Sequence, residues 1–387
     1  MNKPINLGII GAGTVFQEMH FPALLKLKYK FYISKIFDTE KNSYRILKDK
    51  YKTLPESVFT DSCNKIFKDE QIDAVAVLSP TSAHLQYSLL ALKNNKHIFI
   101  EKPVAVSQKE ILKIKYESDK TKLILQIGMV LRHSGFYKKL KELIDSKKYG
   151  KVLWMQWTET RPFDPKIWRY LNPERDGDAI IHDKAIHQIN LFNEFSGAKP
   201  VKVFASANQY LLNKNKFINL RAFEDEVPLK GSSFDNLMTI IQYENGVKAN
   251  LMISYVSPHS RESRWIIQTE KAKIVVHPET FIPNVNNKKH SWKGNPSCIY
   301  LFSDNNNFNP PWKIPMQYPP SEKNLIYYNE YKNEPMHPGS VSQWVSFYNS
   351  VKKGTKPDCN IELALSDNKV IEAIFKSVVS QKMILIH

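Results

Sequence analysis

The first third of the chain alternates short apolar runs with stretches that have helical spacing. Helical spacing occurs at residues 21–27 and 85–92. The apolar runs lie at residues 5–10, 32–37, 74–78, 97–100 and 123–127. Short buried strands that alternate with helices are typical of a parallel sheet with helices on both faces. The pattern therefore predicts a first α/β domain, which we place at residues 1–127.

The rest of the chain, residues 128–387, has a different pattern. Asn245-Gly246 lies between two apolar runs and indicates a hairpin, because both positions of a tight hairpin turn need positive φ. Helical spacing returns at 341–348 and 362–376. Strand-like runs occur at 152–158, 201–205, 217–221, 237–243, 247–255 and 265–269. Successive strands with few helices predict a second α/β domain with a mostly antiparallel sheet.

One segment of the second domain departs from this pattern. Residues 303–340 are rich in Pro, Asn and Tyr and contain Pro310-Pro311 and Pro319-Pro320. Proline removes a backbone donor and disfavours both helix interiors and central strands. We therefore expect a long ordered loop or arm there.

Length and composition restrict the class of protein. A chain of 387 residues suits two domains, and 42% hydrophobic residues argue against wholesale disorder. No apolar run reaches the ~18 residues of a membrane span, and Met1-Asn2-Lys3-Pro4 lacks the layout of a signal peptide. Cys63, Cys298 and Cys359 are scattered and lack metal spacing. We expect a cytoplasmic protein with reduced thiols and no membrane partner.

The formal charge of +17 permits two interpretations, a nucleic-acid binder or a lysine-rich surface. Only 8 of the 55 basic residues are arginine, the residue favoured for bidentate contacts with phosphates and bases. The lysines are spread along the chain and form no block. The sequence therefore favours a lysine-rich surface over a nucleic-acid binder. The positive potential of such a surface would still steer an anionic substrate such as a nucleotide sugar.

Gly11 and Gly13 follow the first apolar run, in the order Gly11-Ala12-Gly13-Thr14-Val15. The first glycine permits a tight turn, and the second lets the backbone approach a pyrophosphate at a helix N-terminus. Asp38 ends the second run, where its carboxylate would bind ribose hydroxyls and repel a 2′-phosphate. These residues predict an NAD site, with NADP less favoured. The alternative for Asp38 is a cap of the following helix, and Phe16 departs from the usual third glycine.

Two further polar groups follow the third and fourth runs. Ser79-Pro80-Thr81, with His84 shortly after, predicts a loop along the cofactor; ordinary helix-start chemistry is the alternative. Glu101 and Lys102 stand at the carboxyl end of a strand, where open α/β sheets bind ligands. There Lys102 would hydrogen-bond a substrate hydroxyl and the nicotinamide ribose. A surface ion pair of little energetic value is the alternative.

Asp183 and His187 are four residues apart in an expected helix and so share a face. A carboxylate and an imidazole in this relation can orient each other and accept a hydroxyl proton. His182 lies on a different face, and we interpret it as structural. A zinc site built from these three side chains is disfavoured, because the HExxH spacing is absent and no third ligand is evident, so we expect no metal.

Arg161, Trp168 and Arg169 follow the first strand of the second domain. They are candidates to line a substrate cleft, because arginine pairs with phosphate or carboxylate and tryptophan covers a sugar face. An interface or core role is the equally open alternative.

The order of these groups resembles the Gfo/Idh/MocA family of oxidoreductases. The resemblance covers nearly the whole chain except the segment at 303–340. It rests on residues 8–13, His20-Phe21-Pro22-Ala23-Leu24, Pro80 with His84, Glu101-Lys102-Pro103, Gly128 with Arg132, Asp183 with His187, Asn245-Gly246-Val247 and the closing helices. Three departures, which bear more on the substrate than on the fold, are Phe16, Gly177-Asp178-Ala179 in place of a glycine triplet, and Asn190 in place of Asp.

The resemblance implies a Rossmann domain followed by an α/β domain with an open sheet, often used in oligomer contacts. We therefore expect a homodimer or homotetramer. It implies that Lys102 contacts substrate and cofactor and that His187, aided by Asp183, handles the proton; we place Arg132 with the substrate residues. The implied activity is NAD-dependent hydride transfer at a secondary hydroxyl of a sugar, sugar phosphate or nucleotide sugar. An NAD-dependent glycosidase of the same fold and a non-catalytic dinucleotide sensor are the alternatives.

Overall fold

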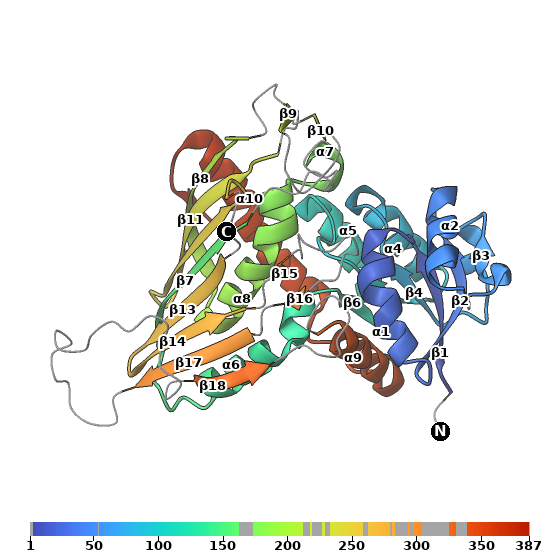
Figure 1. Cartoon of the computed structure of the whole chain (residues 1–387), viewed down its shortest axis with the longest axis horizontal. Helices are drawn as coiled ribbons and strands as arrows, with labels where there is room; N and C mark the ends of the chain where they lie inside the picture. The colour runs from blue at the N-terminus through green and yellow to red at the C-terminus, as the bar shows by residue number, and fades with distance from the viewer. Residues whose placement is uncertain are drawn as a thin grey trace. The chain divides into compact units, whose positions relative to one another are not determined.

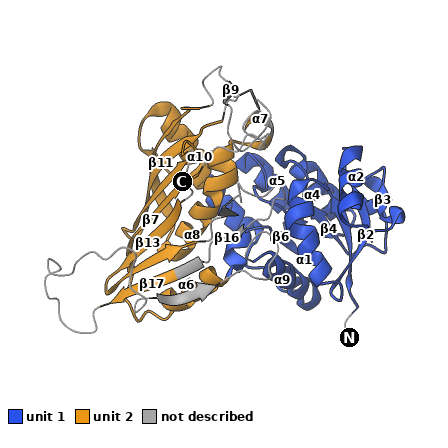
Figure 2. Cartoon of the chain, viewed as in Figure 1, with its two compact units in different colours: residues 1–134, 333–368 blue, residues 135–332, 369–387 orange. Residues whose placement is uncertain are grey.

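The structure, a computed structural model, divides into two compact units (Figure 2). One unit is Met1–Ser134 with Asn333–Asn368, and the other is Gly135–Lys332 with Lys369–His387. The described residues are 3–52, 54–161, 173–211, 217–218, 227–228, 233–257, 262–278, 281–282, 293–294, 297–303, 325–329 and 339–386. The expected domain break at residue 127 therefore lies near the first unit's end at Ser134, but the later segment returns to that unit.

The first unit is built on a six-stranded sheet in the order β3-β2-β1-β4-β5-β6, and every pairing is parallel (Figure 1). This confirms the predicted parallel sheet. The two-residue β3 was not predicted, because so short a run carries no periodicity. The strands are β1 (Ile5–Ile10), β2 (Phe31–Phe37), β3 (Phe59–Thr60), β4 (Ala74–Val77), β5 (His97–Ile100) and β6 (Leu125–Ile127).

Helices connect these strands, and the carboxyl ends of β1, β2, β4 and β5 meet at one edge of the sheet. Ligands bind at this edge in open α/β sheets, near the point where the strand order reverses, here between β1 and β4. The helices are α1 (Phe21–Lys26), α2 (Lys41–Lys50), α3 (Asn64–Phe67), α4 (His84–Lys93) and α5 (Gln108–Asp119). Within the described residues, no helix combines the length and apolar character needed to cross a membrane.

Helix α9 (Ser340–Lys353) belongs to the core of the first unit although it is distant in sequence. Trp344 is fully buried and stacks on Phe99 of β5 with ring centroids 4.2 Å apart. It also meets the edge of the Phe31 ring at 5.4 Å. The sequence predicts this helix in the second domain, because apolar spacing alone does not reveal which sheet a helix covers.

The second unit is built on a nine-stranded sheet in the order β18-β17-β14-β13-β7-β12-β11-β8-β19. Only the β7–β12 pair is parallel, which confirms the predicted, mostly antiparallel sheet. The strands are β7 (Val152–Thr160), β8 (Pro200–Asn208), β11 (Asn236–Tyr243), β12 (Lys248–Ser254), β13 (Glu262–Thr269), β14 (Ala272–His277), β17 (Ser297–Ser303), β18 (Leu325–Asn329) and β19 (Ile384–Leu385). Its helices include α6 (Gly135–Asp145) and α8 (Ile186–Ser196), and α10 (Ile361–Ser380) ends in this unit.

The predicted hairpin joins β11 to β12, but its turn differs from the predicted one. The Tyr243 amide donates to the Val247 carbonyl over 2.9 Å, so three residues form the loop. Gly246 has a φ of +87°, whereas Asn245 does not have positive φ and instead accepts a hydrogen bond from the Val247 amide through Oδ1. The prediction that both positions need positive φ was wrong, because a three-residue loop requires the left-handed conformation only at the glycine.

Part of the expected arm at 303–340 belongs to the large sheet. Its Leu325–Asn329 segment forms β18, which pairs antiparallel with β17. The sequence of β18 contains no proline, so every residue keeps the backbone donor that a ladder needs. Most of the remaining arm lies outside the described residues.

A π-helical segment, η6 (Ala179–Ala185), leads into α8. Gly177 precedes it with a φ of +83°, and a Cβ there would lie 2.7 Å from Cγ of His182. The Asp178 amide donates to Nδ1 of His182 over 3.0 Å. A glycine is thus required both by the backbone conformation and by the ring packed against it.

The buried Asp178 carboxylate caps the N-terminus of η6. Oδ1 accepts hydrogen bonds from the amides of Ile180 (2.9 Å) and Ile181 (2.8 Å), and Oδ2 accepts one from the Phe234 amide (2.7 Å). Only 3% of Asp178 is exposed, and burial raises its pKa to about 6 against the opposing effect of these amides. The cap therefore ties the start of η6 to the segment before β11.

Replacing Trp344 by Ala should destabilise the first unit by about 3–5 kcal/mol, because it removes a fully buried aromatic side chain. Guanidinium unfolding followed by circular dichroism measures the loss. Tyr116→Ala is the matched control, since this aromatic side chain of α5 in the same unit is 65% exposed, and it should cost far less. Equal losses in the two variants would contradict the core role of α9.

Asp178→Asn should change the pH dependence of stability. The folded pKa of about 6 lies above the ordinary value of 3.8, so between these values the folded state binds more protons than the unfolded state. The contribution of Asp178 to stability therefore falls as pH rises through this window, by up to about 3 kcal/mol. The free energy of unfolding of wild type minus that of Asp178→Asn should decrease from pH 4 to pH 7, as measured by chemical unfolding. A difference that increases over this range would contradict the raised pKa.

Candidate functional site

The two positions after β1 that carry glycine do so for different structural reasons. Gly11 has a φ of +97°, and a Cβ there would lie 2.7 Å from backbone atoms of Leu78 and Ser79. A Cβ on Gly13 would meet no atom within 4 Å. Gly11 is thus required by the turn, and the space beside Gly13 is open to a ligand. Both observations fit the loop of a dinucleotide site.

An irregular helix accommodates Phe16, the bulky residue at the third glycine position. Thr14-Val15 leads into the π-helical segment η1 (Phe16–His20), which continues as α1. Phe16 is fully buried and packs against Phe21, with ring centroids 5.5 Å apart. Nε2 of Gln17 donates to the Ala12 carbonyl over 2.8 Å and fixes the helix to the loop. The wider π-helical turn accompanies the large side chain at a position where a tight helix–sheet contact is usual.

Asp38 lies at the carboxyl end of β2 and is partly exposed. Its Oδ2 accepts a hydrogen bond from the Ala12 amide (2.6 Å), and its Oδ1 accepts one from the Glu40 amide (2.8 Å). The carboxylate thus supports the glycine loop and the start of α2. Each carboxylate oxygen accepts more than one hydrogen bond, so capacity for ribose hydroxyls remains. This geometry is compatible with both sequence-based interpretations of Asp38.

His84 connects two loops at the carboxyl edge of the first sheet. Its Nδ1 lies 2.9 Å from the Pro103 carbonyl and its Nε2 lies 2.9 Å from the Ser79 carbonyl. Ser79, Thr81 and His84 are all buried, and Pro80 lies between them in the sequence. His84 therefore holds the loop after β4 against the loop after β5, a structural function that the sequence did not reveal.

A series of hydrogen bonds runs through buried side chains and ends at the Lys102 amide. Nε1 of Trp344 donates to Nδ1 of His20 over 3.2 Å, so Nδ1 is the acceptor of the ring and Nε2 carries a proton. Nε2 then donates to Oε1 of Glu101 over 3.0 Å, while Oε2 accepts from the Lys102 amide over 3.1 Å. A Cβ at Gly128 would lie 2.5 Å from Oε1 of Glu101, so only glycine leaves room for this carboxylate.

The Glu101 carboxylate is held as an anion beneath the Lys102 backbone. Burial raises its pKa, but the hydrogen bond from His20 and the positive charge of Lys102 outweigh burial, so the net pKa is lowered. Its oxygens are engaged by protein donors, which gives Glu101 a part in positioning Lys102. His20 and Trp344 were missed as site residues: His20 belonged only to a family motif, and nothing in the sequence pointed to Trp344.

Arg132 lies in the first unit, in the short helical turn η4 (Val130–His133) after β6. The residue is 9% exposed, and its amide donates to the Met129 carbonyl over 3.0 Å. Its backbone is therefore fixed one helical turn after Gly128, the residue that lies against Glu101.

In the second unit, Asp183 lies in η6 and His187 lies in the first turn of α8. The amides of His182 (2.9 Å) and Asp183 (3.1 Å) both donate to the Asp178 carbonyl, the mixed pattern of a π-helical turn. The predicted helix is thus present, but its first part is wider than a regular α-helix. His182 packs on the Phe375 ring at 4.9 Å, in line with its structural interpretation. Among the described residues, no group of three His, Cys, Asp or Glu side chains is placed to hold a metal ion.

Arg161 directly follows β7 in the second unit. Its guanidinium carbon lies 4.0 Å from the centroid of the Tyr255 ring, and its amide donates to the Ser254 carbonyl over 2.9 Å. Because β7 and β12 are parallel neighbours, Arg161 and Tyr255 leave the sheet at the same end. Trp168 and Arg169 lie outside the described residues.

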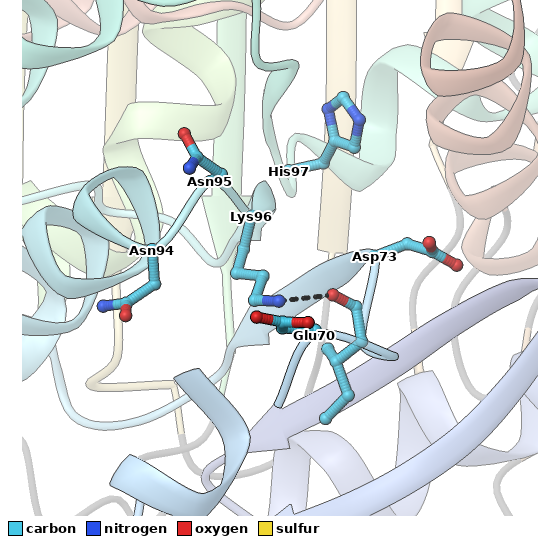
Figure 3. A pocket seen from close by; sticks show the side chains of 7 residues that line it. Glu70, Asp73, Asn94, Asn95, Lys96 and His97 are labelled. Carbon is cyan, nitrogen blue, oxygen red and sulfur yellow. Dashed lines mark hydrogen bonds between the residues drawn. The ribbon is translucent and has the colours of Figure 1, made fainter. Parts of the chain in front are cut away.

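A polar cavity of about 330 Å³ lies at the opposite edge of the first sheet, where β4 and β5 begin (Figure 3). Nζ of Lys96 donates to the carbonyls of Asp69 (2.6 Å) and Ile72 (2.7 Å), so this lysine stabilises the backbone of the segment before β4. The dinucleotide site is expected at the carboxyl edge instead. The cavity is lined by Glu70, Ile72, Asp73, Asn94, Asn95, Lys96 and His97.

Comparisons with known proteins agree with this geometry. Residues 5–129 match the model of the oxidoreductase family with an NAD-binding Rossmann fold. Residues 137–275 match the model of the GFO/IDH/MocA C-terminal domain. The first part of the chain is thus an NAD-binding Rossmann domain, as predicted.

Curated relatives match over about half of the chain. Oxidoreductase P35 of Formosa agariphila is 28% identical over 51% of this chain and 62% of its own length. Myo-inositol 2-dehydrogenase of Thermotoga maritima is 25% identical over 62% of this chain and 66% of its own length. The chain thus spans less than two thirds of either relative.

Solved structures share the fold over the whole chain. Levoglucosan dehydrogenase in complex with NADH and levoglucosan has a TM-score of 0.76 at 14% identity, with 99% of both chains covered. Aldose-aldose oxidoreductase from Caulobacter crescentus has a TM-score of 0.74 at 18% identity, with 99% of both chains covered. Both family models match in the expected order, with the fold they describe. The chain therefore belongs to the Gfo/Idh/MocA family of oxidoreductases.

Proposed function

We propose that the protein is an NAD-dependent dehydrogenase that acts on a secondary hydroxyl of a sugar, sugar phosphate or nucleotide sugar. The observation that carries the proposal is the carboxyl edge of the first sheet, where Gly11, Gly13, Asp38 and Lys102 follow the ends of three strands. Relatives named as inositol dehydrogenases support a polyol or sugar substrate.

The mechanism assigns one task to each polar side chain. NAD, when bound, supplies the hydride acceptor. We propose that the Lys102 ammonium donates a hydrogen bond to the substrate hydroxyl oxygen and stabilises the negative charge that develops there. His187 accepts the hydroxyl proton, and Asp183 stabilises the resulting imidazolium. Glu101 holds the Lys102 backbone in place for this task.

The substrate is proposed to be anionic or to carry a phosphate. The net charge of +17 favours the approach of an anion, and the Arg161 guanidinium lies over the Tyr255 ring, which reduces its freedom before a ligand binds. Arg132 is a further proposed contact. The assignment of Trp168 and Arg169 to the substrate stays a prediction.

The protein is proposed to act as a cytoplasmic homodimer or homotetramer. Four large apolar side chains that the strand register places on one face of the second sheet are between 39% and 49% exposed, and a group of this kind is typical of an association surface. Cys63 and Cys359 are free thiols, as expected for a reducing compartment. The four exposed side chains are Trp154, Phe204, Met238 and Ile240.

The proposal predicts NADH formation from one class of sugar, with a strong dependence on Lys102. A panel of sugars, sugar phosphates and nucleotide sugars is assayed at the NADH absorbance band. Lys102→Ala should lower kcat by about 10²- to 10³-fold, because it removes the donor to the reacting oxygen. Lys109→Ala, an exposed lysine of α5, is the matched control and should retain full turnover.

Near wild-type turnover in Lys102→Ala would contradict its assignment. Release of a free sugar without net NADH would favour the glycosidase. Cofactor binding with no reaction on any sugar would favour the sensor.

Asp38→Asn should weaken the preference for NAD over NADP. The amide keeps an acceptor for the Ala12 amide but loses the charge that repels a 2′-phosphate. Fluorescence titration should show about tenfold weaker NADH binding and tighter NADPH binding. Asp49→Asn, at an exposed position of α2, is the control. An unchanged ratio of the two affinities would remove Asp38 from the cofactor site.

A further inference from the structure

A buried carboxylate on β7 lies beneath the helix that carries Asp183 and His187. Glu159 is 3% exposed and shares the inner face of the sheet with the buried Met155 and Trp157. An ionised carboxylate is costly in such a place unless donors satisfy it. In the sequence, Glu159 appears only as the residue after a strand-like run, and this position points to no function.

Glu159 binds two side chains of that helix. Oε1 accepts from Nζ of Lys184 over 2.9 Å, and Oε2 accepts from Nε2 of Gln188 over 3.1 Å. Lys184 directly follows Asp183, and Gln188 directly follows His187. One carboxylate therefore restrains the residue next to each of the two proposed proton-handling groups.

The two bonds span an irregular junction. Lys184 lies in the π-helical η6, and Gln188 lies in α8, which begins at Ile186. A π-helical turn contains one residue more than an α-helical turn. If η6 relaxed to a regular helix, the chain before η6 would rotate by about 100° relative to α8, and Asp183, which lies within η6, would rotate by part of that angle. Such a rotation would change the direction of Asp183 relative to His187.

We propose that Glu159 is a positioning residue that fixes the rotation of Asp183 relative to His187 by holding Lys184 and Gln188 across this junction. The inference rests on the proposed function, in which Asp183 and His187 handle the substrate proton. Because Glu159 is only 3% exposed and binds two side chains of the helix, it acts through the helix and not on the substrate.

The test separates positioning from stability with three variants. Glu159→Leu leaves the Lys184 ammonium without its carboxylate and should lower the melting temperature. Glu159→Leu/Lys184→Leu removes both charges, and apolar replacement of a buried pair commonly preserves stability. Glu159→Gln keeps an acceptor of similar shape. Glu262→Leu, at an exposed position on β13, is the control.

The double variant should melt close to wild type and yet show kcat reduced at least tenfold, with KM for NAD within twofold. Glu159→Gln should retain at least a third of the wild-type kcat, and Glu262→Leu should match wild type. A double variant that is stable and turns over like wild type overturns the inference.

Hydrogen exchange supplies a readout that needs no substrate. Amides of residues 183–188 should exchange at least tenfold faster in the double variant than in wild type, while the later turns of α8 stay unchanged. Unchanged exchange at 183–188 also overturns the inference. If wild type reacts with no sugar of the panel, the proposed function fails, whereas the exchange result still decides whether Glu159 holds the junction.

Discussion

A buried chain of hydrogen bonds behind Lys102 connects segments of the first unit that are far apart in the sequence. Trp344 donates to His20, His20 donates to Glu101, and Glu101 accepts from the Lys102 amide. The bonds among Trp344, His20 and Glu101 are buried, so the loss of one of these partners leaves another unsatisfied. The helix after the glycines, the loop after β5 and helix α9 must therefore be in place together before Lys102 is fixed.

The sheets could be predicted from the sequence because burial of a strand leaves a local pattern. The bounds of β1 and β5 agree with their apolar runs, and the β11–β12 hairpin agrees with Asn245-Gly246. The position of α9 could not be predicted, because an amphipathic helix fits either sheet. The fit of Trp344 against Phe99 decides it, and that contact joins residues 245 positions apart.

The candidate site was predictable in its residue types but not in its hydrogen bonds. The difference between Gly11 and Gly13 follows from backbone geometry that their spacing encodes. His84 and Glu101 were interpreted as ligand-facing, whereas the structure bonds them to neighbouring loops. The Glu159–Lys184 pair joins a strand to a helix, and only the tertiary fold brings such partners together.

Both units place their candidate residues on irregular backbone that acidic side chains hold. Irregular turns cost free energy and persist only where their surroundings determine them. Asp38 binds the loop before η1, while Asp178 and Glu159 hold η6 at its start and at its junction with α8. A carboxylate suits this task because it accepts several directed hydrogen bonds at once. The same property makes these turns sensitive to a single substitution. Losing one carboxylate removes the acceptor of several donors together and frees the turn that positions the reactive groups.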